Sequence, residues 1–179
     1  MKRSPLPRFR PPGGAATPVT AAELGTLLAL LRAMRPRPVS VVIGAAADEV
    51  SRANAARIER AWTERGGLSF GIVAWPEEAA SWLRPARRFT APAPDAWIVT
   101  ATPPGWAGMG RRLAFSTGWS PRRTVATAAL AEPALIASAG VDTFDGLRGA
   151  HPDGRWWEFS RTVLVDGAAP LRTLSPTSE

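Results

Sequence analysis

Short apolar strands that alternate with amphipathic helices constrain the fold of this chain more than any other feature of its sequence. Residues 39–44 form a run typical of a strand buried on both faces, and residues 48–65 then place apolar side chains at helical spacing. The alternation continues, with further strands predicted at 68–75, 96–102 and 123–130. Parallel strands covered by helices on both faces fit this order. The sequence therefore predicts an α/β fold with an open, mostly parallel, doubly wound sheet of about four βα units.

Proline and glycine mark the expected ends of two further helices. One helix is predicted to begin at Pro76, where Glu77 and Glu78 would suit the positive end of the helix dipole. A short helix is predicted to begin at Pro133 and to close at Gly140, since glycine readily adopts the conformation that ends a helix.

Three segments of different character divide the chain. Residues 1–19 are rich in Pro, Gly and Arg and are expected to form an extended or disordered arm. Residues 20–140 contain the α/β core, whose first helix has Thr20 as its N-cap and Glu23 at the far end of a capping box. Residues 141–179 are expected to form a β-hairpin-like extension and a flexible tail.

The extension is predicted from a Trp- and Val-rich run between two Asp-Gly pairs. The pairs at 153–154 and 166–167 are turn signals. Because side chains alternate along a strand, Trp156 and Trp157 are expected on opposite faces, one in the core and one outside. His151, which precedes the first pair, is interpreted as a turn residue.

Composition excludes several classes of function. The chain has no cysteine and a single histidine, His151, which excludes thiol catalysis, Cys-ligated zinc and a multi-histidine metal site within one chain. No nucleophile, base and orienting group occur together, and no glycine-rich phosphate loop is present. We therefore expect no enzymatic activity, no metal and no cofactor.

The charge balance is strongly basic and comes almost entirely from arginine. The chain has 22 Lys and Arg against 15 Asp and Glu, a net charge of +7. Phosphates attract such a surface, but a GC-rich genome also favours arginine, and the arginines are scattered without a run longer than two. Nucleic acid is therefore not the favoured partner. Residues 1–18 lack the apolar core of a signal peptide, and the apolar stretch 24–31 is too short to span a bilayer. These features predict a cytoplasmic protein without membrane insertion.

Candidate binding residues follow the predicted strands. In doubly wound sheets, ligands bind beyond the carboxyl ends of the strands. Two interpretations stay open for the polar candidates. Asp48 would bind a ligand amine or cap the following helix, and Thr100 and Thr102 would bind a ligand or reflect strand propensity alone. The candidate contacts for a small polar ligand are Gly44, Ala45, Asp48, Val50, Ser51, Trp75, Glu77, Thr100, Thr102 and Thr127.

Several landmarks of the predicted core occur in a recognisable order. They are Gly66 at the end of a helix, the Pro-Asp-Ala run at 94–96, Gly118 with Pro121, and Glu132-Pro133 followed by Leu135-Ile136. This order resembles the type I periplasmic-binding fold, and within it the branched-chain amino-acid (Leu/Ile/Val-type) substrate-binding family of ABC importers. The resemblance covers roughly residues 8–140.

The resemblance implies a binding lobe rather than a whole receptor. Such receptors hold the ligand between two lobes that close like a hinge, and this chain has room for one, similar to the family's second lobe. A second copy of the chain or a partner lobe would supply the facing wall. The family carries an aromatic residue and a glycine close to the ligand, where this chain has Val50 and Ser51.

The expected function is therefore non-catalytic binding of an amino-acid-like small molecule. The alternative is a ligand-less regulatory or protein-interaction module, or a dimerising remnant, on the same fold. An arginine-rich nucleic-acid binder is the third and least favoured interpretation.

Overall fold

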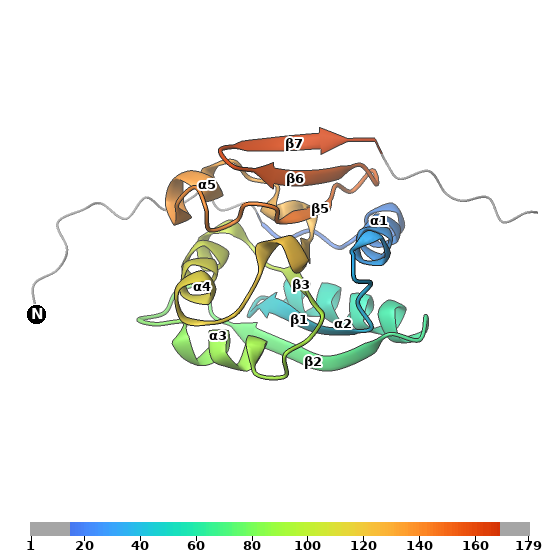
Figure 1. Cartoon of the computed structure of the whole chain (residues 1–179), viewed down its shortest axis with the longest axis horizontal. Helices are drawn as coiled ribbons and strands as arrows, with labels where there is room; N and C mark the ends of the chain where they lie inside the picture. Colours follow the sequence, from blue (N-terminus) through green and yellow to red (C-terminus); the bar gives the residue numbers. More distant parts are fainter. Residues whose placement is uncertain (1–14, 169–179) are drawn as a thin grey trace, which may run out of the picture.

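The computed structural model describes residues 15–168, and the predicted alternation of strands and helices is present in them (Figure 1). The strands are β1 (Ser40–Ala46), β2 (Leu68–Trp75), β3 (Ala96–Thr100), β4 (Thr124–Ala126), β5 (Arg148–Ala150), β6 (Trp156–Ser160) and β7 (Val163–Gly167). The helices are α1 (Ala21–Ala33), α2 (Glu49–Thr63), α3 (Leu83–Thr90), α4 (Pro103–Ser116) and α5 (Ala134–Ala139), with 3-10 turns η1 (Pro121–Arg123) and η2 (Ala128–Leu130). The predicted α/β class is confirmed.

The strands form one seven-stranded sheet in the order β2-β1-β3-β4-β5-β6-β7. The pairs from β2 to β5 are parallel, and β6 and β7 add two antiparallel strands at one edge. The chain leaves β1 toward β2 on one side and returns to β3 on the other, so the strand order reverses between β1 and β3. In such sheets, the crevice at this reversal is the usual ligand position.

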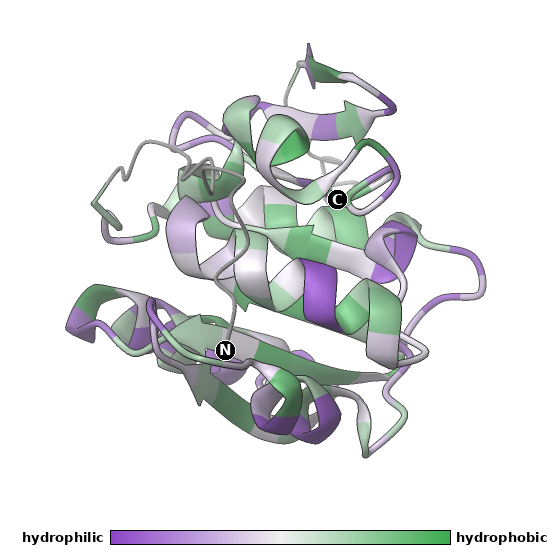
Figure 2. Ribbon diagram, turned by 90° about the vertical axis from the view of Figure 1, so that its left-hand side faces the viewer, coloured by the Kyte–Doolittle hydropathy of each residue, from purple (hydrophilic) through white to green (hydrophobic). Residues whose placement is uncertain are grey.

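Alternation along the strands divides the core into two layers. In β1, Val41, Ile43 and Ala45 pack in the cluster under α1 and α2, while Val42 and Ala46 pack in the cluster under α3, α4 and α5. Figure 2 faces the side that carries α3, α4 and α5, and hydrophobic colouring follows the strands behind these helices. Both faces of the parallel part are therefore covered, as the continuous apolar strand runs predict.

The predicted helix boundaries hold at α1 and α2. The Thr20 side chain accepts a hydrogen bond from the Glu23 amide at 3.0 Å, and Gly66 follows α2 with a φ of 80°. The end of the predicted arm is anchored, because the Val19 amide donates to Asn54 Oδ1 at 2.8 Å. Residues 1–14 of that arm, and the predicted tail from residue 169, lie outside the described residues.

The predicted start of the third helix, at Pro76, is wrong. α3 begins at Leu83, and residues 76–82 form a loop in which Trp82 Nε1 donates to the Pro76 carbonyl at 3.1 Å. Pro85 explains the late start, because proline is tolerated in a first helical turn but breaks a helix interior. The two glutamates of this loop therefore do not lie in the first turn of a helix.

Two boundaries in the C-terminal part also differ from prediction. β4 ends at Ala126 instead of continuing to residue 130, because η2 follows it. The Asp-Gly pair at 166–167 lies inside β7, and the turn before β7 contains Arg161, with a φ of 53°. The strand needs a glycine at 167 because Trp156 covers it, and an added Cβ would lie 2.2 Å from that ring.

The two tryptophans of β6 confirm the predicted alternation. Trp157 is fully buried, whereas Trp156 is partly exposed on the opposite face. The other Asp-Gly pair does form a turn, in which Gly154 has a φ of 88°. His151 lies before this turn, and its Nε2 atom is 2.6 Å from Asp166 Oδ1.

Candidate functional site

The carboxyl ends of the parallel strands meet at one edge of the sheet, which we call the carboxyl edge. It is formed by the residues that follow β1 to β4, together with the N-terminus of α1: residues 20–23, 46–51, 75–78, 100–105 and 126–128. The N-termini of α1, α2 and α4 therefore lie at this edge. Helix N-termini offer unpaired amide groups and a positive dipole end, so the partners of these amides decide what the edge can bind.

At the turn between β1 and α2, Asp48 caps the helix. Its Oδ1 atom accepts the Ser51 amide at 2.7 Å, and the Thr100 hydroxyl donates to the Ser51 carbonyl at 2.7 Å. Two polar atoms of this turn are left without a partner. Asp48 Oδ2 and Ser51 Oγ are buried and have no hydrogen-bond partner among the described residues. The helix-cap interpretation of Asp48 thus accounts for one carboxylate oxygen and leaves the other free.

At the turn between β3 and α4, the cap comes from a distant loop. The helix opens with two prolines, which have no amide hydrogen, so Gly105 carries its first free amide. Glu77 Oε2 accepts from this amide at 2.8 Å, and the Thr102 hydroxyl donates to Glu77 Oε1. Glu77 therefore complements the N-terminus of α4 and not that of α3, contrary to the sequence interpretation.

A third carboxylate, on Glu23, joins α1 to η2. Its Oε1 atom accepts the Ala128 amide at 2.7 Å, and the residue is only 2 % exposed. Burial raises the pKa of Glu23, against the opposing effects of its backbone hydrogen bonds and of the nearby His151. Sequence reasoning assigned Glu23 to a capping box and did not place it at the carboxyl edge, because its partner lies 105 positions away.

Together these contacts give the carboxyl edge a definite polarity. One amide at each of the starts of α2, α4 and η2, on Ser51, Gly105 and Ala128, donates to a carboxylate of the protein. An anionic ligand would find these three amides occupied and carboxylates beside them. The edge therefore favours ligands that donate hydrogen bonds or carry positive charge.

The predicted contacts do gather at this edge, but they differ in accessibility. Gly44, Ala45, Ser51, Trp75, Thr100 and Thr127 are buried, whereas Asp48, Val50, Glu77 and Thr102 are partly exposed. The Trp75 ring packs directly against Gly44, where an added Cβ would lie 2.5 Å from Trp75 Cζ3. Trp106 was not among the predicted contacts. Its ring centroid lies 5.8 Å from that of Trp75, and neither indole N–H has a partner among the described residues.

Two other properties limit what the described part of the chain can do. Within residues 15–168, His, Asp and Glu side chains form no group of three that could hold a metal ion. No helix in this range is both long and apolar enough to cross a membrane.

Comparison with known proteins identifies the fold. No protein-family model and no curated protein sequence matches the chain. Solved structures do match: a leucine binding protein from Thermotoga maritima (19% identity over 71% of this chain and 35% of the other, TM-score 0.57), a substrate-binding periplasmic protein from Ralstonia solanacearum (14%, 74% and 37%, TM-score 0.60) and an extracellular ligand-binding receptor from Rhodopseudomonas palustris (18%, 74% and 36%, TM-score 0.61).

These matches give the chain the fold of periplasmic substrate-binding proteins, which confirms the predicted resemblance at the level of the fold. More particularly, it is the type I periplasmic-binding fold, here with seven strands in one sheet. The chain spans a little over a third of the length of the matched structures, 35–37% in these three. Their names describe binding proteins.

Proposed function

We propose that this chain is a non-catalytic binding lobe of the substrate-binding-protein type, and that it binds an amino-acid-like molecule through its ammonium group at the carboxyl edge. The observation that carries the proposal is the buried, unpaired Oδ2 atom of Asp48 at the N-terminus of α2, where the Ser51 Oγ atom is also buried and unpaired. A buried carboxylate oxygen without a donor is unfavourable. A ligand ammonium group would supply the missing donor.

The acidic character of the carboxyl edge also bears on where the ligand carboxylate would bind. Because one amide at each start of α2, α4 and η2 already binds a carboxylate, three acidic groups lie at this edge and would repel the carboxylate of an amino acid. The facing wall, from a second copy or a partner lobe, would bind that group. One lobe alone is therefore expected to bind weakly.

The test is a thermal-shift and calorimetric titration with three matched probes: leucine, isoamylamine, which lacks the carboxylate, and 4-methylpentanoate, which lacks the amine. A ligand that binds only the folded state stabilises it by about 2.7 kcal/mol at a hundred times its Kd. Leucine and isoamylamine are expected to stabilise the protein, and 4-methylpentanoate is not.

A variant pair connects the response to the carboxylate. Asp48→Asn keeps a good helix cap and removes the charge, so it is expected to abolish the shift without unfolding the chain. Glu49→Gln removes the same charge from an exposed neighbour and is expected to leave the shift unchanged. Equal loss in both variants, or stabilisation by 4-methylpentanoate alone, would contradict the assignment.

The second candidate is a ligand-less interaction module. The burial of Gly44, Trp75 and Thr100 favours it, because these strand-end residues are used in packing or internal hydrogen bonds. No stabilisation by any probe, together with a concentration-dependent dimer in light scattering, would support this alternative.

A further inference from the structure

A long stretch of the sequence carries almost no negative charge. Between Glu78 and Glu132 the only acidic residue is Asp95. That carboxylate is already engaged, since its Oδ2 atom accepts hydrogen bonds from the Val39 and Ser40 amides and from the Ser40 hydroxyl. Arginine occurs in the same stretch at positions 84, 87, 88, 111, 112, 122 and 123.

Four of these seven arginines are exposed on α3 and α4, which the fold places side by side. α3 and α4 pack together on the same face of the sheet, with their C-terminal ends at the edge opposite the carboxyl edge. Arg87 and Arg88 are exposed in the last turn of α3, and Arg111 is exposed on α4. Within the described part of the chain, none of these three forms an ion pair with a carboxylate. Their charge is therefore available to an outside partner.

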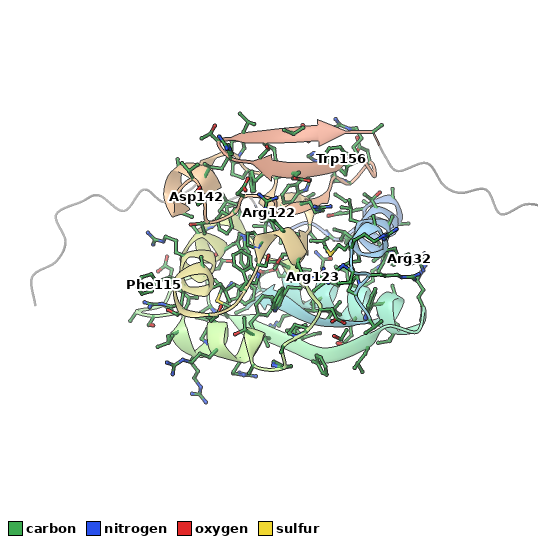
Figure 3. The ribbon with its side chains drawn as sticks, viewed as in Figure 1. Arg32, Phe115, Arg122, Arg123, Asp142 and Trp156 are labelled. Carbon is green, nitrogen blue, oxygen red and sulfur yellow. The ribbon has the colours of Figure 1, made fainter. Side chains whose placement is uncertain are left out.

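An exposed aromatic ring lies within this basic surface. Phe115 follows Arg111 by one helical turn and is 88 % exposed, more than any other large apolar side chain of residues 15–168. Figure 3 shows Phe115 at the side of the molecule where α4 adjoins α3, away from Arg32 on α1. Nothing in the described fold packs against this ring to account for its position.

An open surface pocket of about 550 Å³, which we call the cavity, lies between the C-terminal ends of the two helices. Arg87, Thr90 and Thr117 supply polar groups to its lining, and Trp97 contributes an apolar wall. The pocket is open to solvent, so it would cover only part of a bound molecule. Both hydroxyls donate to carbonyls of their own helices, so Arg87 is the group of this lining that would bind an anion, beside the Trp97 ring.

We propose that this surface, defined by Arg87, Arg88, Arg111, Phe115 and the cavity, binds single-stranded nucleic acid, with one nucleotide unit in the cavity. Arginine pairs well with phosphate because its planar guanidinium donates two parallel hydrogen bonds. Exposed aromatic rings beside a basic groove stack on unpaired bases. The concave shape argues against a flat anionic membrane as the partner. The site lies at the opposite edge from the proposed amino-acid site and does not depend on it.

The tertiary structure favours nucleic-acid binding more than the sequence does. Nucleic acid was disfavoured because the arginines are scattered along the chain. Helix packing places α3 beside α4, so that Arg87 of α3 lines a pocket together with residues that follow α4, which no local run of residues could reveal.

The test is fluorescence anisotropy of a labelled oligothymidine of about twelve nucleotides, titrated with the full chain at several salt concentrations. Each phosphate contact to a single strand contributes about 0.7 to the slope of log affinity against log salt. Removal of two contacts in the double variant Arg88→Ala/Arg111→Ala is therefore expected to lower the slope by about 1.4. Phe115→Ala is expected to weaken binding roughly tenfold through lost stacking.

A charge-matched control separates a site from general attraction. Arg32→Ala/Arg52→Ala removes the same charge from exposed positions on α1 and α2. It is expected to change the affinity and slope little. Equal effects of the two double variants, or no binding at low salt, would overturn the proposal.

Competitors identify the source of the nucleotide unit. Displacement of the oligomer by free thymidine monophosphate would assign the cavity to single nucleotides, and displacement only by unlabelled oligomer would assign the whole surface to a strand. Either result supports nucleotide recognition. Equal displacement by polyglutamate, or binding to phosphatidylserine vesicles without oligomer binding, would overturn it.

Discussion

Gly44 offers a direct test of whether a predicted ligand contact is a packing position. An added Cβ would lie 2.5 Å from Trp75 Cζ3, 2.6 Å from Trp75 Cη2 and 2.9 Å from Phe89 Cε2. Carbon atoms pack best at about 3.5–4.0 Å, so Gly44→Ala requires these rings to move by about 1 Å in a fully buried cluster. Overpacking of this kind costs about 1–3 kcal/mol.

Urea unfolding would measure this cost against a matched control. Gly25→Ala adds the same methyl group within α1, where nothing lies within 4 Å, and is expected to stabilise the protein by up to about 1 kcal/mol through helix propensity. The double variant Gly44→Ala/Trp75→Ala removes the ring that collides. In the Trp75→Ala background, Gly44→Ala is then expected to lower the free energy of unfolding by at least about 1 kcal/mol less than in the wild type. This difference is the coupling expected between contacting residues. A neutral Gly44→Ala, or a cycle without coupling, would refute the packing role.

Three further predictions concern carboxylates. Glu77→Ala leaves the Gly105 amide without its acceptor and is expected to lower the free energy of unfolding, measured in urea, by about 1–2 kcal/mol. Glu77→Gln retains an acceptor and is expected to lose less stability. Equal losses in the two variants would show that charge alone matters. Because burial raises the pKa of Glu23, ionisation is disfavoured in the folded state, so stability falls as pH rises from the unfolded pKa of Glu23 to its folded pKa. Glu23→Gln is expected to flatten this part of the thermal-stability profile, and an unchanged profile would contradict the assignment. Hydrogen bonds, first that from the Val39 amide, lower the pKa of Asp95, so its contribution is present above its unfolded pKa and is lost as pH falls through the folded pKa. Asp95→Asn is expected to be less stable at neutral pH and to lose less on acidification, and an equal acid loss would refute this.

Some features of the site could be predicted because their causes are local. Asp48 was expected either to cap α2 or to bind a ligand, and the cap is formed by an amide only three positions away. The strand ends were expected at one edge because parallel strands covered by helices require it. The candidate contacts therefore lie at a common edge. Their use in ligand binding stays a prediction.

Other features were missed because their partners lie far along the chain. Glu77 was assigned to the helix that follows it, but its partner amide on Gly105 is 28 positions away, and that amide is the first free one only because two prolines precede it. The loop after β2 therefore contacts the start of α4 and not that of α3. No pattern near Glu77 in the sequence contains this information.

By itself, the sequence determined the order of strands and helices, the parallel sheet, the caps at Thr20 and Asp48 and the exclusion of cysteine and multi-histidine chemistry. These follow from residue types and from contacts within one or two turns. Only the tertiary structure decided that Glu77 and Glu23 bind amides at distant helix starts and that Arg87 of α3 shares a pocket with residues that follow α4. The physical reason is that these groups meet through sheet order and helix packing, which bring together residues from distant parts of the chain.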